Sequence, residues 1–185
     1  HRLPVMARAM ATDSLRLFFS LWPTDEVRQQ IVAASKQTVA AAGGKPIPPE
    51  NYHVTLAFLG SVPRDAVNEL IKVARNIHFP AFQLQFDCNG YWPRSQIVWL
   101  EPSVMPSPME TLVSDLWAEL EPLGFAPEGH SFKPHVTLAR RVPGEPGRLP
   151  DPAIIWPVSD FVLVQSDTQP SGSVYSLLEH FPAGP

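Results

Sequence analysis

Two segments of the chain share the five residues His-Val-Thr-Leu-Ala and could supply matched groups to one reaction. The first copy spans 53–57 and the second spans 135–139. Histidine suits proton transfer, because its unperturbed pKa of about 6.5 leaves the neutral and charged forms both populated near neutral pH. One histidine can take a proton from an attacking water while the other protonates a departing oxygen, as in-line displacement at phosphorus requires. The threonine hydroxyls would hold the phosphoryl oxygens.

Arg140 directly follows the second copy. A guanidinium stays charged at physiological pH and binds phosphate oxygens through paired hydrogen bonds. We expect Arg140 to stabilise the negative charge that develops on the phosphate, although an ordinary surface cation would look the same in the sequence. The scheme needs no metal ion and no other cofactor, and we expect none.

β-Strands would position these groups, because residues i and i+2 of a strand point the same way. Strict alternation puts His53, Thr55 and Ala57 on one face and leaves Phe58 on the core side. The copy at 135–139 repeats this alternation. The imidazole and the hydroxyl of one copy then lie roughly 6.5–7 Å apart along the strand. If the two strands lie near each other, both pairs converge on one pocket.

A lone histidine on a strand is usually a solvated polar residue, and threonine is a common strand former. Two identical copies in the same register favour a functional reading, because a structural duplication has no need to keep His and Thr on the polar face. The other candidates lack a partner motif, and we assign no role to His78, His130, His180 or Cys88. We expect Arg94, Lys133 and Arg141 to be solvated charges, although an RNA strand leaving the pocket could use them.

Composition limits what the chain can be. Its 185 residues, 44% of them hydrophobic, can bury one core, and we expect a single domain over 14–185 after a disordered or expression-derived segment over 1–13. A net charge of -4 argues against broad contact with duplex nucleic acid, so any nucleic-acid contact should be local. A single cysteine and the lack of an apolar run of about 20 residues indicate a cytoplasmic protein without a membrane span.

The order of the predicted elements indicates an α+β fold with about seven strands and three helices. The expected strands are 15–21, the two repeat segments, 82–87, 97–100, 161–165 and 174–178, with 82–87 pairing with 97–100 across the turn CNGYWPRS. The expected helix after Thr24 ends at Gly43 and Gly44, and its inward residues are Val27, Ile31, Ala34 and Val39. Two further helices are expected from their apolar faces. The first face consists of Val67, Leu70, Ile71, Ala74 and Ile77. The second face consists of Met109, Leu112, Val113, Leu116 and Leu120.

These motifs resemble the two-histidine (2H) phosphoesterase superfamily, whose members carry two His-x-Thr/Ser motifs in the two halves of a duplicated fold. Within it, the chain is most similar to the bacterial RNA 2′,3′-cyclic phosphodiesterases, also called 2′-5′ RNA ligases. The resemblance rests on RLFFSLWP at 16–23, PPENYHVTLAFLG at 48–60, YWPRSQIVWL at 91–100 and FKPHVTLAR at 132–140. It implies two pseudo-symmetric lobes, with antiparallel sheets and flanking helices around a central groove.

The resemblance also implies an activity, the hydrolysis of a 2′,3′-cyclic phosphate to a 2′-phosphate. The substrate would be an RNA 3′ end, such as that of a tRNA half, or a cyclic nucleotide, and the reverse reaction would join RNA ends. His53 would be the proton donor and His135 the proton acceptor, while three residues would bind phosphate: Thr55, Thr137 and Arg140. Phe19 matches a position near the nucleotide, where it could stack on a base, although a core phenylalanine fits equally well. The strands after residue 143 match less specifically, so no role is assigned to Ser166 or Tyr175.

Two other functions fit parts of this pattern. A binding module would hold a nucleotide or RNA end without turning it over. A metal hydrolase would use the histidines as ligands, but the sequence contains no close cluster of His, Asp and Glu. We favour the metal-independent phosphodiesterase, acting as a monomer.

Overall fold

The computed structural model describes residues 13–129 and 131–185, so most of the segment predicted to be disordered or expression-derived, residues 1–12, lies outside the described residues. Two four-stranded antiparallel sheets dominate the fold. The first, which we call lobe A, has the strand order β10-β9-β1-β3. Its strands are β1 (Ser14–Leu21), β3 (Val54–Pro63), β9 (Asp160–Gln169) and β10 (Gly172–Pro182).

The second sheet, lobe B, has the order β2-β7-β6-β5. Its strands are β2 (Lys45–Pro46), β5 (Cys88–Trp92), β6 (Ile97–Glu101) and β7 (Val136–Arg140). A separate antiparallel pair joins β4 (Phe82–Phe86) to β8 (Ile154–Val158). The predicted α+β fold with antiparallel sheets is confirmed. The two HVTLA repeats lie in different lobes, each with its histidine directly before the strand and its other four residues on the strand.

Helix α2 (Asp25–Ala42) begins and ends where the sequence predicts. The Oγ1 of Thr24 accepts a hydrogen bond from the backbone N–H of Val27, which satisfies one free donor of the first turn. Gly43 ends the helix with φ 72°, a left-handed conformation that favours glycine. The buried face differs from the prediction: Ala34 is exposed, whereas Ser35 and Thr38 are buried, because the contact with lobe B follows the line Val27, Ile31, Ser35, Thr38, Ala42.

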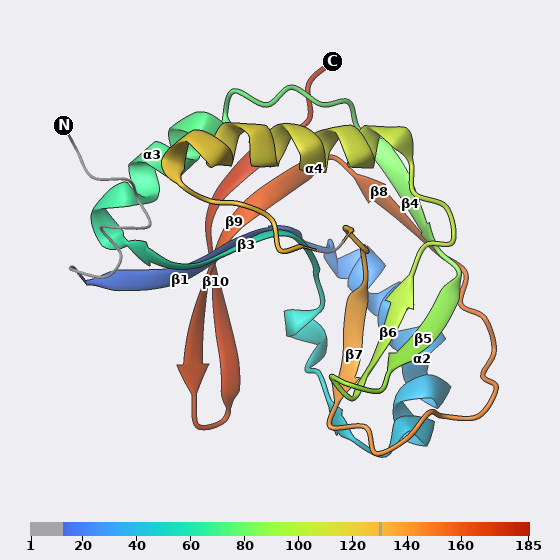
Figure 1. Ribbon diagram of the computed structural model, residues 1–185. Helices are drawn as coiled ribbons and strands as arrows, with labels where there is room; N and C mark the ends of the chain where they lie inside the picture. Colours follow the sequence, from blue (N-terminus) through green and yellow to red (C-terminus); the bar gives the residue numbers. More distant parts are fainter. Residues whose placement is uncertain (1–12, 130) are drawn as a thin grey trace.

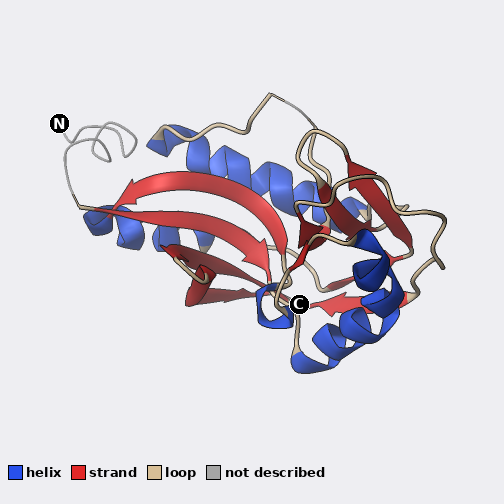
Figure 2. Cartoon of the chain, turned by 90° about the horizontal axis from the view of Figure 1, so that it is seen from below, coloured by secondary structure: helices blue, strands red, loops and turns tan. Residues whose placement is uncertain are grey.

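Helix α3 (Val67–Ala74), preceded by a 3-10 turn at Arg64–Ala66, and helix α4 (Ser107–Leu120) cover lobe A. All five residues predicted for the inward face of α4 are buried. In Figure 1, α3 and α4 lie over one face of the β1–β3–β9–β10 sheet, and α2 lies behind β5, β6 and β7. The perpendicular view confirms that the helices lie on outer sides, with the strands between them (Figure 2).

The predicted pairing of 82–87 with 97–100 is wrong. The chain stays extended from 82 to 92 but changes sheets at Asp87, whose carboxylate accepts hydrogen bonds from the backbone N–H and Oγ of Ser103. β4 therefore pairs with β8, and β5 pairs with β6 across a turn at 93–96. β8 was not predicted because it contains Pro157, a residue that strands tolerate mainly at edges.

The two lobes do not correspond to the two halves of the sequence. Lobe A combines β1 and β3 with the C-terminal strands β9 and β10, and lobe B likewise draws strands from both halves. The helices also cross between lobes: α2 follows β1 of lobe A but contacts β7 of lobe B, and α4 follows β6 of lobe B but contacts β3 of lobe A. One continuous hydrophobic core joins both lobes.

Candidate active site

In lobe A, the repeat strand contains an extra residue directly after its threonine. Phe19 of β1 is opposite Ala57 and Ser20 is opposite Thr55, so Leu56 has no partner on β1. Such a β-bulge bends the strand and interrupts the alternation of side chains.

The repeat strand of lobe B has its extra residue at the same position of the motif. Val98 of β6 is opposite Ala139 and Trp99 is opposite Thr137, so Leu138 is unpaired. The duplicated sequence therefore carries a duplicated backbone irregularity.

The bulges decide which residues reach the groove between the lobes. Leu56 and Ala57 are both buried, so alternation resumes one residue late and Phe58, predicted to face the core, is 44% exposed and lines the groove. By the same shift, Ala139 is buried and Arg140 faces the groove. Under strict alternation Arg140 would point away from His135 and Thr137, so its position in the groove depends on the bulge.

His53 is held by its own chain segment and enclosed by aromatic rings. Its Nδ1 lies 2.7 Å from the carbonyl oxygen of Asn51. A carbonyl oxygen only accepts, so Nδ1 carries the hydrogen of this bond and Nε2 is left for the substrate. The Trp22 ring stacks on the imidazole with centroids 5.2 Å apart and planes 11° apart, and Phe18 and Tyr175 lie at 5.2 and 5.3 Å.

His135 has the same backbone anchor but a more open setting. Its Nδ1 lies 2.8 Å from the carbonyl oxygen of Lys133, again two residues before the histidine. Trp92 contacts the ring at 4.7 Å, nearly perpendicular to it at 73°. Both histidines therefore share one tautomer, with Nε2 as the free nitrogen.

Burial is the largest influence on both histidines. It lowers the pKa of His53 to about 4; the hydrogen bond to Asn51 opposes this, and the charges of His135 and Arg140 add to it. Burial also lowers the pKa of His135, opposed by the hydrogen bond to Lys133 and reinforced by Arg140. A phosphate anion between the rings would raise both pKa values, because an opposite charge favours the imidazolium.

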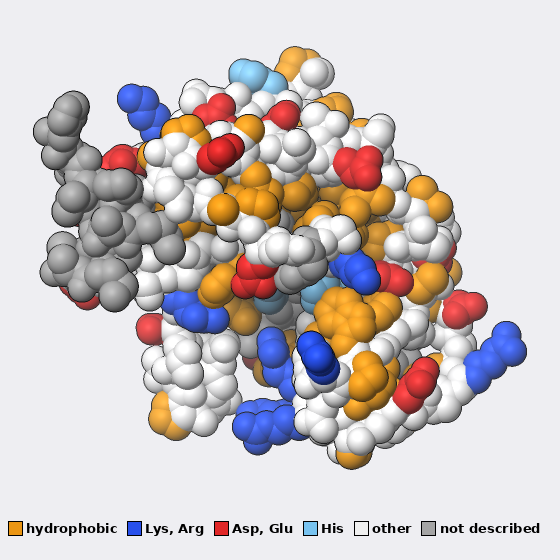
Figure 3. All heavy atoms as spheres, viewed as in Figure 1, with side chains coloured by type: hydrophobic (Ala, Val, Ile, Leu, Met, Phe, Trp, Pro, Cys, Tyr) orange, Lys and Arg blue, Asp and Glu red, His pale blue; other side chains and the backbone are white. Residues whose placement is uncertain are grey.

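The groove between the lobes has a volume of about 630 Å³ and brings together every predicted site residue except Phe19. His53, Thr55, His135, Thr137 and Arg140 all line it. Its further polar lining consists of Arg16, Lys45, Asn51, Arg141, Ser166, Thr168, Ser171, Ser173 and Tyr175. Among the described lining residues there is no Asp or Glu. Figure 3 shows Lys and Arg side chains gathered around this hollow.

Phe19 does not fit the predicted contact with a base. It is fully buried and packs against Phe161 and Phe181 in the core. Its neighbour Phe18 points to the opposite face of β1, lines the groove and contacts His53. A one-residue shift along a strand exchanges its two faces, so the aromatic position beside the site is Phe18.

Sequence reasoning also missed several groove residues. Arg16 shares the groove face of β1 with Phe18, and its guanidinium carbon lies 4.6 Å from the centroid of the Phe58 ring. The i, i+2 spacing of Arg16 and Phe18 was a signal for this face. Arg141, expected to be a solvated charge, lines the groove, and the C-terminal strands contribute Ser166 and Tyr175.

The described residues hold neither a metal-binding cluster nor a membrane-spanning helix. Within residues 13–129 and 131–185, no group of three or more His, Cys, Asp or Glu side chains is arranged to hold a metal ion. Among the helices of these same residues, none combines the length and apolar character needed to cross a bilayer.

Known proteins resemble this chain in sequence and in fold. Residues 21–99 match the model of the LigT like phosphoesterase family. An RNA 2′,3′-cyclic phosphodiesterase of Thermus thermophilus is 32% identical over 180 residues, which cover 90% of this chain and 89% of the relative. One from Escherichia coli is 32% identical over 168 residues, which cover 90% of this chain and 95% of the relative.

Solved structures agree with this similarity. The crystal structure of E. coli LigT complexed with 3′-AMP superposes with a TM-score of 0.84 at 30% identity, covering 92% of this chain and 99% of that chain. The chain therefore belongs to the LigT-like phosphoesterase family, within the 2H superfamily, as its paired motifs predicted.

Proposed function

We propose that the protein hydrolyses 2′,3′-cyclic phosphates at RNA ends or on nucleotides to 2′-phosphates. The observation that carries this proposal is the pair of backbone-anchored imidazoles, each with Nε2 free, in one groove with Thr55, Thr137 and Arg140. Relatives that align with 90% of the chain are named RNA 2′,3′-cyclic phosphodiesterase. The two motifs supply the acid, the base and the phosphate contacts that this reaction needs.

In the proposed reaction, His135 takes a proton from water as the water oxygen forms a bond to phosphorus. The bond from phosphorus to the 3′ oxygen breaks, and the Nε2–H of His53 protonates that oxygen. Thr55, Thr137 and Arg140 hold the non-bridging oxygens, whose negative charge grows in the transition state. With a 5′-hydroxyl in place of water, the same proton transfers in the same direction would give 2′-5′ ligation, because the 5′ oxygen bonds to phosphorus as the bond to the 3′ oxygen breaks.

The choice of His53 as the acid depends on bound phosphate. With a pKa of about 4, His53 is neutral near neutral pH and its Nε2 carries no proton unless an anion raises that value. The stacked Trp22 ring supports this assignment, because the face of an indole favours a cation. Burial, reinforced by the charge of Arg140, lowers the pKa of His135 and favours the neutral ring that a base requires.

We propose RNA ends as the substrate and the cytoplasm as the setting. RNA ends, including those of tRNA halves, fit a groove whose lining is basic although the whole chain carries a net charge of -4. All proposed contacts come from one chain, so we propose a monomer. We also propose a cytoplasmic location, since the single cysteine needs no oxidising compartment.

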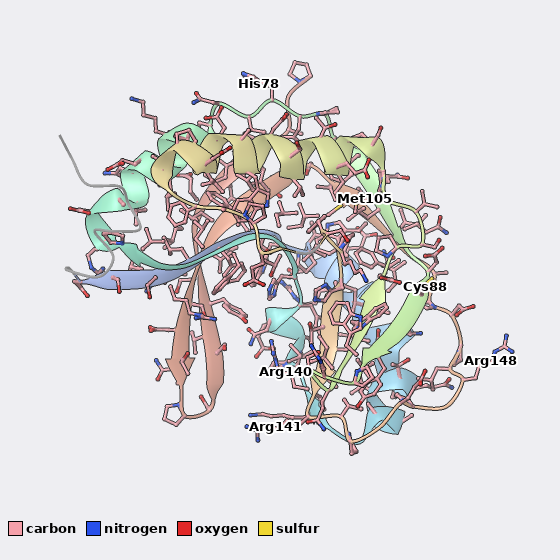
Figure 4. The ribbon with its side chains drawn as sticks, in the orientation of Figure 1. His78, Cys88, Met105, Arg140, Arg141 and Arg148 are labelled. Carbon is pink, nitrogen blue, oxygen red and sulfur yellow. The ribbon has the colours of Figure 1, made fainter. Side chains whose placement is uncertain are left out.

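The test compares wild type, His53→Ala and His135→Ala on adenosine 2′,3′-cyclic phosphate and on an oligonucleotide that ends in a cyclic phosphate. Each variant should lose about 10²–10⁴-fold in kcat, and the wild-type product should be the 2′-phosphate. His78→Ala is the matched control, because His78 is exposed and points away from the groove (Figure 4).

Other results would support the alternatives. A binding module would show altered affinity in the two variants but no product from wild type. A metal hydrolase would lose activity in excess chelator. Near wild-type turnover by either histidine variant would rule out the two-histidine mechanism.

A further inference from the structure

The groove carries more positive charge than one cyclic phosphate can use. Four cations line it: Arg16, Lys45, Arg140 and Arg141. None of these four forms an ion pair with a carboxylate among the described residues. The arginines that do form such ion pairs there are Arg28, Arg64 and Arg75. A phosphodiester contributes one negative charge. Once Arg140 is assigned to the reacting phosphate, the other three cations have no counterion.

The backbone brings Lys45 to the same end of the groove as Arg140. In the short pairing of β2 with β7, Lys45 is opposite Arg140. This approach requires Gly44, because a Cβ at that position would collide with the carbonyl oxygen of Arg140. Lys45 is therefore placed by backbone geometry and not by chance on a flexible loop.

Arg141 is fixed in an unusual conformation beside them. Its φ of 53° is in the left-handed region that residues other than glycine rarely adopt. The next residue holds it there: the N–H of Val142 donates to the carbonyl oxygen of Gln96, and the carbonyl oxygen of Val142 accepts from the Tyr91 hydroxyl. Strained backbone that neighbours hold in place is a feature of binding sites. In Figure 4 the Arg141 side chain extends from the end of β7 toward the β9–β10 hairpin.

The hairpin places hydroxyl groups on the wall of the groove that faces these cations. The hydroxyl-bearing residues Ser166, Thr168, Ser171 and Ser173 line this wall. Asn51 fixes the wall to the catalytic segment, because its side-chain amide donates to the carbonyl oxygen of Ser173 while its own carbonyl oxygen accepts from His53. Hydroxyls on one wall and cations on the other suit a phosphate group.

We propose that Lys45, Arg141 and the hairpin hydroxyls form a second phosphate-binding subsite. It takes the phosphate on the 5′ side of the nucleotide whose cyclic phosphate reacts between His53 and His135. This inference rests on the proposed function and specifies its substrate: an RNA strand with at least one phosphate before the terminal nucleotide binds better than a nucleoside cyclic phosphate.

The test uses three substrates: adenosine 2′,3′-cyclic phosphate, the same compound with a 5′-phosphate, and the dinucleotide ApA with a terminal 2′,3′-cyclic phosphate. Charge-assisted hydrogen bonds to one phosphate should raise kcat/KM about ten-fold or more for the second and third compounds over the first. In Arg141→Gln and Lys45→Gln this ratio should fall to below about three. Arg148→Gln should keep the wild-type ratio, because Arg148 is exposed and points away from the groove (Figure 4).

The outcomes separate the subsite from the reaction. Equal kcat/KM on all three compounds, or an unchanged ratio in Arg141→Gln, overturns the subsite and leaves the proposed function in place. A preference for the dinucleotide alone also overturns it, because the second nucleoside and not the phosphate would then be recognised. Absence of turnover on every compound overturns the proposed function. The subsite is then tested by calorimetry on His135→Ala, in which the two compounds that carry the additional phosphate should bind about ten-fold more tightly than adenosine 2′,3′-cyclic phosphate.

Discussion

The two lobes hold their histidines in the same way but surround them differently. In each lobe the imidazole Nδ1 bonds to the carbonyl oxygen two residues earlier, and an extra leucine follows the threonine. In lobe A three aromatic rings enclose His53, whereas in lobe B only Trp92 is in ring contact with His135 among the described residues. The orientation of the ring is thus common to both lobes, and the environment that sets its proton affinity is not.

The groove residue after each bulge differs as well. Lobe B places Arg140 there, and lobe A places Phe58 at the equivalent position. The cation of lobe A comes from the neighbouring strand, where Arg16 lies over the Phe58 ring. A duplicated strand can therefore keep its proton-transfer group while its phosphate-binding charge diverges.

The largest expected effect tests whether the two histidines have different roles. A p-nitrophenyl phosphodiester releases a weakly basic anion, so its cleavage needs a base but no acid. On this substrate His53→Ala should recover to within about ten-fold of wild type, whereas His135→Ala should stay about 10²–10⁴-fold below it. Initial rates of nitrophenolate release measure both. Recovery of His135→Ala in place of His53→Ala would show that the acid and the base are exchanged between the lobes.

Arg140 and Arg16 test the divergence of the charged position. Arg140→Gln should lower kcat/KM about 10²-fold, because it removes a donor to the charge that develops in the transition state. Arg140→Lys should recover only part of this loss, since an ammonium lacks the planar fork of a guanidinium. Arg16→Gln should cost less, about five-fold. An equal loss from Arg16→Gln would mean that the Arg16–Phe58 pair is a full equivalent of Arg140.

The pKa of His53 predicts an effect on stability at acidic pH. In the unfolded chain the imidazole takes up a proton below about pH 6.5, but in the folded protein it does so only near pH 4. The free energy of unfolding should therefore fall as pH drops through this window, by about 2–3 kcal/mol from His53. His53→Gln should show a correspondingly smaller fall in urea unfolding at pH 7 and pH 4.5. Parallel pH dependences in the two proteins would contradict the shifted pKa.

The smallest expected effect concerns the two tryptophans. Trp22→Leu should lower kcat by about two- to five-fold relative to Trp22→Phe, because leucine removes the ring face that favours the His53 imidazolium. The matched pair Trp92→Leu and Trp92→Phe should differ less, since Trp92 lies nearly perpendicular to His135. A larger difference at Trp92 would place the imidazolium in lobe B.

Periodic features of the fold were predictable from the sequence. The five apolar residues of α4, the cap at Thr24 and the strand character of both repeats follow from local patterns, and the structure confirms them. Strand pairing was not predictable in the same way, because the partner of 82–87 depends on where the chain changes sheets at Asp87. The partner strand, β8, was not predicted because it contains Pro157.

In the site, too, the residue types were predictable from the sequence, but the details that depend on strand pairing were not. The sequence identified the residues that meet in the groove through their repetition, but it could not show the bulges at Leu56 and Leu138, because an extra residue exists only relative to a partner strand. The choice of Phe19 over Phe18 followed the resemblance to the family. Two adjacent phenylalanines do not by themselves show which face is the core, but Arg16, two residues before Phe18, was a local signal for the groove face.

The crossing of the helices between lobes has a consequence for how the chain folds. α2 packs on lobe B although it follows the first strand of lobe A, and α4 packs on lobe A although it follows a strand of lobe B. A chain cut between the two repeats would leave each sheet without strands or a helix that the other piece carries. We therefore expect a single cooperative unfolding transition, in which the groove exists only when the whole chain is native.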